Sequence, residues 1–282
     1  MAHLWHIRDR ILTIDRPLVV GILNITPDSF SDGGEFFDVV KAVERGLQLV
    51  AAGADVLDLG GESSRPRATP VDEEEELRRV VPVVAGLVRQ TQTPLSIDTM
   101  KPAVARAALE AGASIVNDVS GLRDPAMIAV AAEFHAGAIV MHMQGTPATM
   151  QANPQYADVV REVGAFFEER LQTMTDAGVP REAICLDPGI GFGKKLEHNL
   201  ALLANLGAFA RFNRPICLGV SRKGFIGTVT GRPVQERLAG SLAVACFAAA
   251  RGQAQLLRVH DVEATRDAVL LLEAIDRSAL RA

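Results

Sequence analysis

The sequence predicts an α/β fold, a closed (β/α)8 barrel of the TIM type preceded by a short N-terminal β-hairpin. From Pro17 onward the chain repeats one pattern eight times: a short apolar run, a polar break and an amphipathic helix. The apolar runs are mostly continuous, as is typical of parallel strands buried on both faces. Polar residues follow each run, at positions that would meet at one end of a barrel. An open doubly wound sheet is the alternative, but no Gly-x-Gly-x-x-Gly follows the first strand.

The elements can be assigned in order along the chain. Residues 4–7 and 11–14 are expected to pair as the hairpin around Arg8-Asp9-Arg10. Eight strands are predicted at 18–24, 55–60, 94–98, 114–118, 138–142, 183–187, 215–220 and 256–259. The helices are predicted at 38–52, 72–91, 101–111, 125–135, 156–177, 195–210, 234–251 and 261–277. Asp72 can cap the second of these helices, and the four glutamates after it suit a helix N-terminus. The chain therefore divides into a hairpin extension, residues 1–16, and one barrel domain, residues 17–282.

Composition narrows the class of protein. A chain of 282 residues can bury a core without disulfides or metals. Its net charge of -5, the lack of a basic block and the sparse aromatic residues argue against a nucleic-acid partner. The most apolar run, 238–250, is too short to span a membrane and is predicted to be a buried helix of small residues. Cys185, Cys217 and Cys246 lie in apolar runs, which indicates reduced core thiols in a cytoplasmic protein.

Polar residues end or follow every predicted strand. They are Asn24; Glu62-Ser63-Ser64-Arg65; Asp98; Asn117-Asp118; His142; Asp187; Ser221-Arg222-Lys223; and Arg258 with His260. Each residue alone could be a helix cap or a turn anchor, but a complete ring of polar residues around the strand ends is hard to explain by capping. The acceptors Asp98, Asn117 and Asp187 could bind the paired N–H donors of a flat heterocycle such as a pterin or guanine. Lys223, Arg258 and His260, on the last two strands, suggest a phosphate or diphosphate site.

The same ring of polar residues limits the reactions that the site could catalyse. Its acids are too widely spaced for a metal cage built from protein alone. Mg2+ held by one protein oxygen, from Asn24, and by diphosphate oxygens is compatible with the pattern. Neither a Ser–His–Asp order nor a nucleophile elbow is present, so covalent catalysis is not indicated. The residues alone predict a barrel enzyme that acts on a planar, phosphorylated ligand.

Seven ordered motifs make the prediction more specific. They are 21–34, 58–66, 117–121, 141–142, 187–194, 221–223 and 258–261. Across about residues 17–277 they resemble the dihydropteroate synthase family of pterin-binding enzymes. The resemblance implies that the chain joins 6-hydroxymethyl-7,8-dihydropterin diphosphate to p-aminobenzoate, releasing diphosphate, by an SN1-like path. It also implies a (β/α)8 barrel, Mg2+ as cofactor, a homodimer and a target for sulfonamides.

Roles for single residues follow from the resemblance. The family's pterin contacts match Asp98, Asn117, Asp187 and Lys223. Arg258 matches the residue that stacks over the pterin and helps to hold phosphate. His260 and Asn24 match the contacts to diphosphate and Mg2+, and Met141 and Phe192 would line the site.

Two loops of the family close over the diphosphate and shape the p-aminobenzoate pocket. The first would supply Phe30 and Asp32, and the second would supply Ser64 and Arg65. The pocket would be bordered by Phe30, Pro66, Phe192 and Ser221. The catalytic residues implied in this way are Asp32, Phe30, Arg65 and Lys223.

The second loop departs from the usual family pattern, and two other functions remain open. Ser64 stands where Thr is usual and Arg67 where Gly is usual, so sulfonamide sensitivity could differ in either direction. A methyltetrahydrofolate-binding domain of a corrinoid methyltransferase could share Asp98, Asn117 and Asp187, but it would need no diphosphate site. A non-catalytic pterin-binding paralogue is the third alternative.

Overall fold

Eight parallel strands form a barrel in the structure, a computed structural model that describes residues 3–25, 34–63 and 70–279 (the side chains of 34–38 and 279 excepted). The strands are β3 (Leu18–Asn24), β4 (Val56–Gly60), β5 (Leu95–Asp98), β6 (Ile115–Asp118), β7 (Gly137–Met141), β8 (Ile184–Asp187), β9 (Cys217–Leu218) and β10 (Leu256–Val259). They lie in the order β8-β7-β6-β5-β4-β3-β10-β9. A parallel bridge between Leu186 and Ile216 joins the first strand of this order to the last. The predicted barrel is confirmed.

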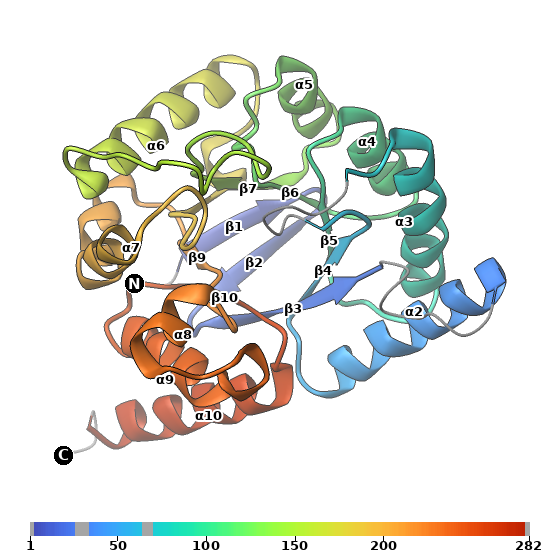
Figure 1. Cartoon of the computed structure of the whole chain (residues 1–282). Helices are drawn as coiled ribbons and strands as arrows, with labels where there is room; N and C mark the ends of the chain where they lie inside the picture. The colour runs from blue at the N-terminus through green and yellow to red at the C-terminus, as the bar shows by residue number, and fades with distance from the viewer. Residues whose placement is uncertain (1–2, 26–33, 64–69, 280–282) are drawn as a thin grey trace.

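Helices surround the strands on the outside of the barrel, as Figure 1 shows. They are α2 (Gly34–Ala51), α3 (Glu73–Val88), α4 (Pro102–Glu110), α5 (Pro125–Glu133), α6 (Val159–Asp176), α7 (Leu196–Ala204), α8 (Gly224–Thr230), α9 (Leu238–Ala249) and α10 (Val262–Ala279). Short 3-10 turns lie at η1 (Arg181–Ala183), η2 (Leu206–Phe212) and η3 (Val234–Glu236). Asp72 caps α3 as predicted, because its carboxylate accepts a hydrogen bond from the Glu75 amide at 2.8 Å. The helix predicted at 195–210 is instead two elements, α7 and η2, and α8 was not predicted.

The N-terminal hairpin closes the end of the barrel where the strands begin. Its strands β1 (His3–Ile7) and β2 (Arg10–Ile14) pair antiparallel. Trp5, Ile7 and Ile14 are buried against apolar side chains from the barrel strands. The barrel side of this cluster consists of Leu18, Val20, Val56, Ile115, Ile139, Cys185, Cys217 and Leu256. The buried Trp5 indole also donates a hydrogen bond to the Ala183 carbonyl at 2.7 Å. The hairpin is therefore part of the barrel core.

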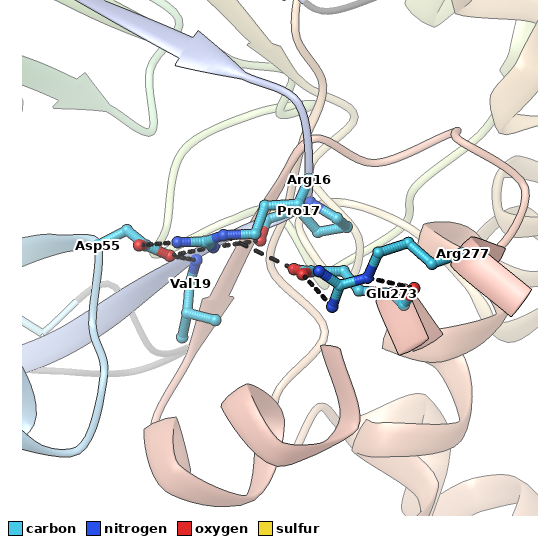
Figure 2. A network of polar contacts seen from close by, with 6 residues as sticks. All are labelled: Arg16, Pro17, Val19, Asp55, Glu273 and Arg277. Carbon is cyan, nitrogen blue, oxygen red and sulfur yellow. Dashed lines mark hydrogen bonds and ion pairs between the residues drawn. The ribbon is translucent and has the colours of Figure 1, made fainter. Parts of the chain in front are cut away.

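Arg16 fixes the connection between the hairpin and the first barrel strand (Figure 2). Its guanidinium donates two hydrogen bonds to the Asp55 carboxylate, at 2.6 and 2.9 Å. Asp55 also accepts the Val19 amide at 2.8 Å, and Glu273 of α10 lies 3.6 Å from Arg16 Nε. The start of β3, the entry to β4 and the last helix are thus held together on one side of the barrel.

Helix α9 is less buried than its composition predicts. Ser241, Ala245 and Ala248 are its buried residues, whereas Leu238 is 38% exposed and Phe247 is 39% exposed. The prediction of a buried helix over 238–250 is therefore wrong for one face of α9 in the single chain. None of the helices among the described residues has the length and apolar character needed to cross a membrane.

We expect Trp5→Ala to lower the free energy of unfolding by about 3 kcal/mol, because it opens a cavity at a closely packed position and removes a buried hydrogen bond. Urea unfolding followed by circular dichroism measures the change. Leu4→Ala is the matched control, because the Leu4 side chain is 50% exposed on the same strand. Equal unfolding curves for the two variants would show that the hairpin does not support the barrel.

Candidate active site

Side chains inside the barrel change from apolar to polar along the strands. Successive residues of a strand face opposite sides, so the residue two positions after an inward-facing one also faces inward. Val56, Ile115, Cys185 and Leu256 contact the hairpin cluster. Two positions further along the same strands stand Asp58, Asn117, Asp187 and Arg258. One layer of the barrel interior is therefore charged or polar, directly above an apolar layer.

The register of the strands aligns the predicted strand-end residues. Asn24 pairs with Gly60, Gly60 with Asp98, and Asp98 with Asn117. On the other side of the barrel, Met141 pairs with Asp187. The expected gathering of these side chains at the carboxyl ends of the strands is thus present in the structure.

Arg258 crosses the barrel interior and joins two carboxylates. Its Nε donates to Asp58 Oδ2 and its Nη2 donates to Asp98 Oδ2, both at 2.6 Å. Asn117 Nδ2 donates to the same Asp58 oxygen at 3.0 Å. Asp58 is fully buried, and a buried carboxylate requires a cation or several donors. We refer to Arg258, Asp58 and Asp98 as the ion cluster.

The ion cluster differs from the sequence prediction in two respects. Arg258 was expected to converge with Lys223 and His260 on an anion, but its guanidinium contacts carboxylates of β4 and β5. Asp58 was not predicted to be a site residue, because it lies within a strand and not at its end. A carboxylate in an apolar strand, two positions after Val56, was the signal that could have identified it.

Burial changes the proton affinity of the ion cluster. It raises the pKa of Asp98 to about 7, an effect that Arg258 opposes and Asp58 reinforces. Burial disfavours the charged form of Arg258, but Asp58 and Asp98 outweigh it and raise the pKa of the guanidinium. Arg258 therefore stays charged, and its contact with Asp98 favours the ionised form of that carboxyl against the effect of burial.

Lys223, Phe192 and Asp187 form a second group at the barrel mouth. Lys223 Nζ lies 4.0 Å from the centre of the Phe192 ring, which places a cation on an aromatic face. Burial lowers the pKa of Lys223 to about 8, and Asp187 opposes this effect. Burial also raises the pKa of Asp187, whose Oδ1 accepts the Gly189 amide at 2.7 Å. A flat ligand with N–H and carbonyl groups could use both Asp187 and Lys223.

Ser221 and His260 meet on the neighbouring strand ends. Ser221 Oγ lies 3.0 Å from His260 Nδ1, and it accepts the His260 amide at 3.2 Å. Arg222, in contrast, forms a salt bridge with Asp261. The first pair was predicted to be in the site, and the second pair ties β9 to the start of α10.

Three other polar residues at the strand ends have structural contacts. Asp118 accepts hydrogen bonds from the Ser120 amide and hydroxyl at 2.7 and 2.8 Å, so it anchors a turn. Glu62 accepts a hydrogen bond from Lys101 at 2.5 Å. His142 lies against Lys194, with 3.0 Å between His142 Nδ1 and Lys194 Nζ. Next to them, Met141 belongs to an apolar cluster that Phe192 joins, and their role as the wall of the site stays a prediction.

Two cavities lie at opposite ends of the barrel. One of about 190 Å³ opens beside Asp98 at the mouth, between the loops that follow β4, β5, β6 and β7. A larger one of about 550 Å³ lies at the hairpin end, between the Arg8-Asp9-Arg10 turn and the loops that enter β5 and β6. We place the active site at the smaller cavity's end, because the ion cluster and Lys223 lie there and the active sites of such barrels form at the carboxyl ends of the strands.

Five predicted site residues lie outside the described residues: Phe30, Asp32, Ser64, Arg65 and Pro66. Their roles stay predictions from the sequence. In the part of the chain that the structure describes, no group of three or more His, Cys, Asp or Glu side chains could hold a metal ion.

Comparisons with known proteins agree with this geometry. The model of the family described as "Pterin binding enzyme" matches residues 20–260. Dihydropteroate synthase of Escherichia coli K12 is 46% identical over 263 residues, which cover 93% of each chain. The structure of Xanthomonas albilineans dihydropteroate synthase with 4-aminobenzoic acid matches at a TM-score of 0.91 and 48% identity, over 98% of this chain and 99% of that one. The structure of the Yersinia pestis synthase with a sulfonamide drug complex matches at a TM-score of 0.91 and 42% identity, over 97% of this chain and 99% of that one.

Both the family model and the relatives span nearly the whole barrel, including every described strand end discussed above. The chain therefore belongs to the pterin-binding enzymes and, within them, to the dihydropteroate synthases.

Proposed function

We propose that the barrel mouth joins 6-hydroxymethyl-7,8-dihydropterin diphosphate to p-aminobenzoate and releases 7,8-dihydropteroate and diphosphate. The chain is then a transferase of an alkyl group, the dihydropterin methyl. The observation that carries the proposal is the alignment of Asp98, Asn117 and Asp187 with Lys223 at one end of a barrel that matches synthases over nearly its whole length. The same arrangement would suit a methyltransferase less well, because His260 at the neighbouring strand end provides a donor for a diphosphate.

The acceptors and donors of the mouth suit a pterin ring. Asp187 has one oxygen on the Gly189 amide, and its other oxygen can accept ring N–H donors. Lys223 can donate to the ring carbonyl. Gly219 lies beside Asp187, because a Cβ there would lie 3.9 Å from Asp187 Oδ2. Apolar contacts from Met141 and Phe192 would cover the ring faces.

The reaction itself requires loss of diphosphate and capture by an amine. The methylene C–O bond breaks, and its electron pair leaves with diphosphate. The electron-rich pterin ring delocalises the resulting cation, and the p-aminobenzoate nitrogen then forms the new C–N bond and loses a proton. Carboxylates that hold the ring favour positive charge on it, whereas His260 favours negative charge on the leaving group. Asp32, Phe30 and Arg65 stay predicted contributors on the two loops, with Ser64 and Pro66 beside the p-aminobenzoate.

Mg2+ is the proposed cofactor, with Asn24 as its protein ligand. Asn24 ends β3 with an exposed side chain and offers one hard amide oxygen. This single donor fits a metal that takes its remaining ligands from diphosphate and water. When bound, Mg2+ would neutralise charge on the leaving diphosphate.

A second copy of the chain is the proposed partner. The neighbouring helices α9 and α10 expose large apolar side chains on the barrel's outer surface, including Phe247, Leu270, Leu271 and Ile275. Leu271 is 64% exposed and Ile275 is 57% exposed. Patches of this kind mark interaction sites, and a symmetric pairing would cover both copies at once.

Two further expectations rest on the sequence and on relatives. The Yersinia pestis synthase was solved with a sulfonamide drug complex, and we propose that this chain binds such drugs in its p-aminobenzoate site. Ser64 and Arg67, where it departs from the usual pattern, lie outside the described residues. A cytoplasmic location stays a prediction that rests on Cys185, Cys217 and Cys246, all three of which are free thiols.

The purified chain should form dihydropteroate and diphosphate from the two substrates when Mg2+ is present. Chromatography of the pteroate and an enzymatic diphosphate assay measure the two products. A corrinoid methyltransferase would release no diphosphate, and a non-catalytic paralogue would bind the pterin without turnover. Pterin binding with no product would thus contradict the proposal.

Asp187→Asn should weaken binding of the dihydropterin diphosphate about 100-fold, because an amide presents one acceptor and a clashing donor pair to the ring N–H groups. Isothermal titration calorimetry measures the affinity. Asp176→Asn, on the exposed end of α6, is the control and should bind as the wild type does. An unchanged affinity in Asp187→Asn would remove Asp187 from the pterin site.

Leu271→Arg should convert the dimer to a monomer, because it places a charge in the centre of the proposed apolar contact. Sedimentation velocity measures the oligomeric state. Ile11→Arg changes a side chain of similar exposure, 57%, on the hairpin and should leave the dimer intact. A wild-type chain that sediments as a monomer, or a dimer that survives Leu271→Arg, would contradict this assignment.

A further inference from the structure

Lys194 is a buried lysine that the proposed reaction does not use. It is 3% exposed, and among the described residues its ammonium contacts no carboxylate. Its Nζ donates to the carbonyls of Phe192 and His142, at 2.9 and 3.2 Å, and lies 3.0 Å from His142 Nδ1. Burial lowers the pKa of His142 to about 2, so the imidazole is neutral and its Nδ1 can accept the third hydrogen bond. Neutral groups alone therefore hold this ammonium, whereas a buried charge is normally paired with an opposite charge.

The loop that carries Lys194 lies directly on the chain that follows β7. Gly189 and Gly193 have positive φ angles of +63° and +58°. A Cβ at Gly189 would lie 1.9 Å from the His142 carbonyl oxygen, and one at Gly193 would lie 2.5 Å from the Gln144 carbonyl oxygen. Only glycine permits so close an approach of two backbones. Lys194 donates to the same His142 carbonyl, so it closes a contact that the glycines make possible.

The same loop positions the pterin side of the site. It begins at Asp187, whose Oδ1 accepts the Gly189 amide. It also carries Phe192. The Phe192 carbonyl accepts a hydrogen bond from Lys194, and the Phe192 ring lies under Lys223. A shift of this loop relative to β7 would therefore move both the Gly189 amide that Asp187 accepts and the ring of Phe192.

Lys194 also acts on Asp187 through its charge. Burial raises the pKa of Asp187, and the Gly189 amide, Lys223, Arg258 and Lys194 each oppose that effect. In turn, burial lowers the pKa of Lys194 to about 7, with Asp187 opposing and Lys223 reinforcing.

Other charged groups act nearby. Arg123 faces His142, and the buried thiol of Cys185 faces Asp187. Lys223 and Arg258 both act on the pKa of Asp187 more strongly than Lys194 does, so the importance of Lys194 lies in its hydrogen bonds to the loop.

We propose that Lys194 is a positioning residue for the dihydropterin substrate: its hydrogen bonds clamp the loop after β8 onto the end of β7. This inference rests on the proposed function, because it assumes that Asp187 accepts hydrogen bonds from the pterin. Lys194 itself does not touch the ring. Its role is to hold in place the residues that do.

Calorimetric titration with 6-hydroxymethyl-7,8-dihydropterin diphosphate and Mg2+, from pH 5.5 to 8.5, tests the proposal. Lys194→Met and Lys194→Gln remove the charge, and Gln keeps one donor for the His142 carbonyl. We expect both to bind about tenfold more weakly than the wild type below pH 7 and to approach it above pH 8. The pH dependence follows because the pKa of Lys194 is lowered to about 7, so the side chain loses its charge and one of its three N–H donors as the pH rises. Lys194→Arg should restore affinity below pH 7.

The exposed neighbour Lys195 supplies the matched control, and Lys195→Met should follow the wild type at every pH. Wild-type affinity in folded Lys194→Met and Lys194→Gln, or a loss by the same factor at every pH, would overturn the proposal. If neither uncharged variant folds, lysine NMR of the wild type decides. The pKa of the Lys194 ammonium should then be higher in the pterin-bound protein than in the free protein. An equal pKa in the two states would contradict the proposal. A wild type that binds no pterin would instead contradict the proposed function.

Discussion

The salt bridges from Arg258 to Asp58 and Asp98 determine what the barrel mouth can do. Three charges in a barrel interior are costly to desolvate, and such clusters contribute little net stability. They do fix geometry: one guanidinium sets the spacing of β4 and β5 across from β10, and Asn117 joins the same Asp58 oxygen. Asp58 Oδ1 is buried with no hydrogen-bond partner among the described residues. An oxygen of this kind favours ligands that bring N–H donors, as a pterin does.

This polar layer depends on the apolar layer beneath it. Trp5 and its hairpin neighbours pack against the strands at the end where they begin, so an apolar layer lies below the ion cluster. The low polarity below accounts for the direction of the pKa changes above, since burial is the first cause for Asp98, Asp187 and Lys223 alike. Stability is concentrated at one end of the barrel and binding at the other, as is general for this architecture.

Most of the fold and about half of the site could be predicted from the sequence. Continuous apolar runs located all eight strands, although β9 pairs only over Cys217–Leu218. Helix α8 was missed because Gly224 and Gly227 give its segment little helical character. Asn24, Asp98, Asn117 and Asp187 could be found at strand ends by position. Asp58 carried only the indirect signal of a carboxylate within an apolar strand, and Lys194 carried none. Their importance lies in partners distant in sequence: Arg258 lies 200 residues from Asp58, and His142 lies 52 from Lys194.

The one composition-based prediction that failed supports the proposed assembly. The run 238–250 is as apolar as a core helix, yet Leu238 and Phe247 of α9 stand more than one third exposed in the single chain. An all-apolar helix is normally buried on every side. The neighbouring helix α10 exposes Leu271 and Ile275. Hydrophobic composition records burial in the assembled protein, so a helix that looks buried in sequence but half-exposed in one chain indicates where a second chain packs.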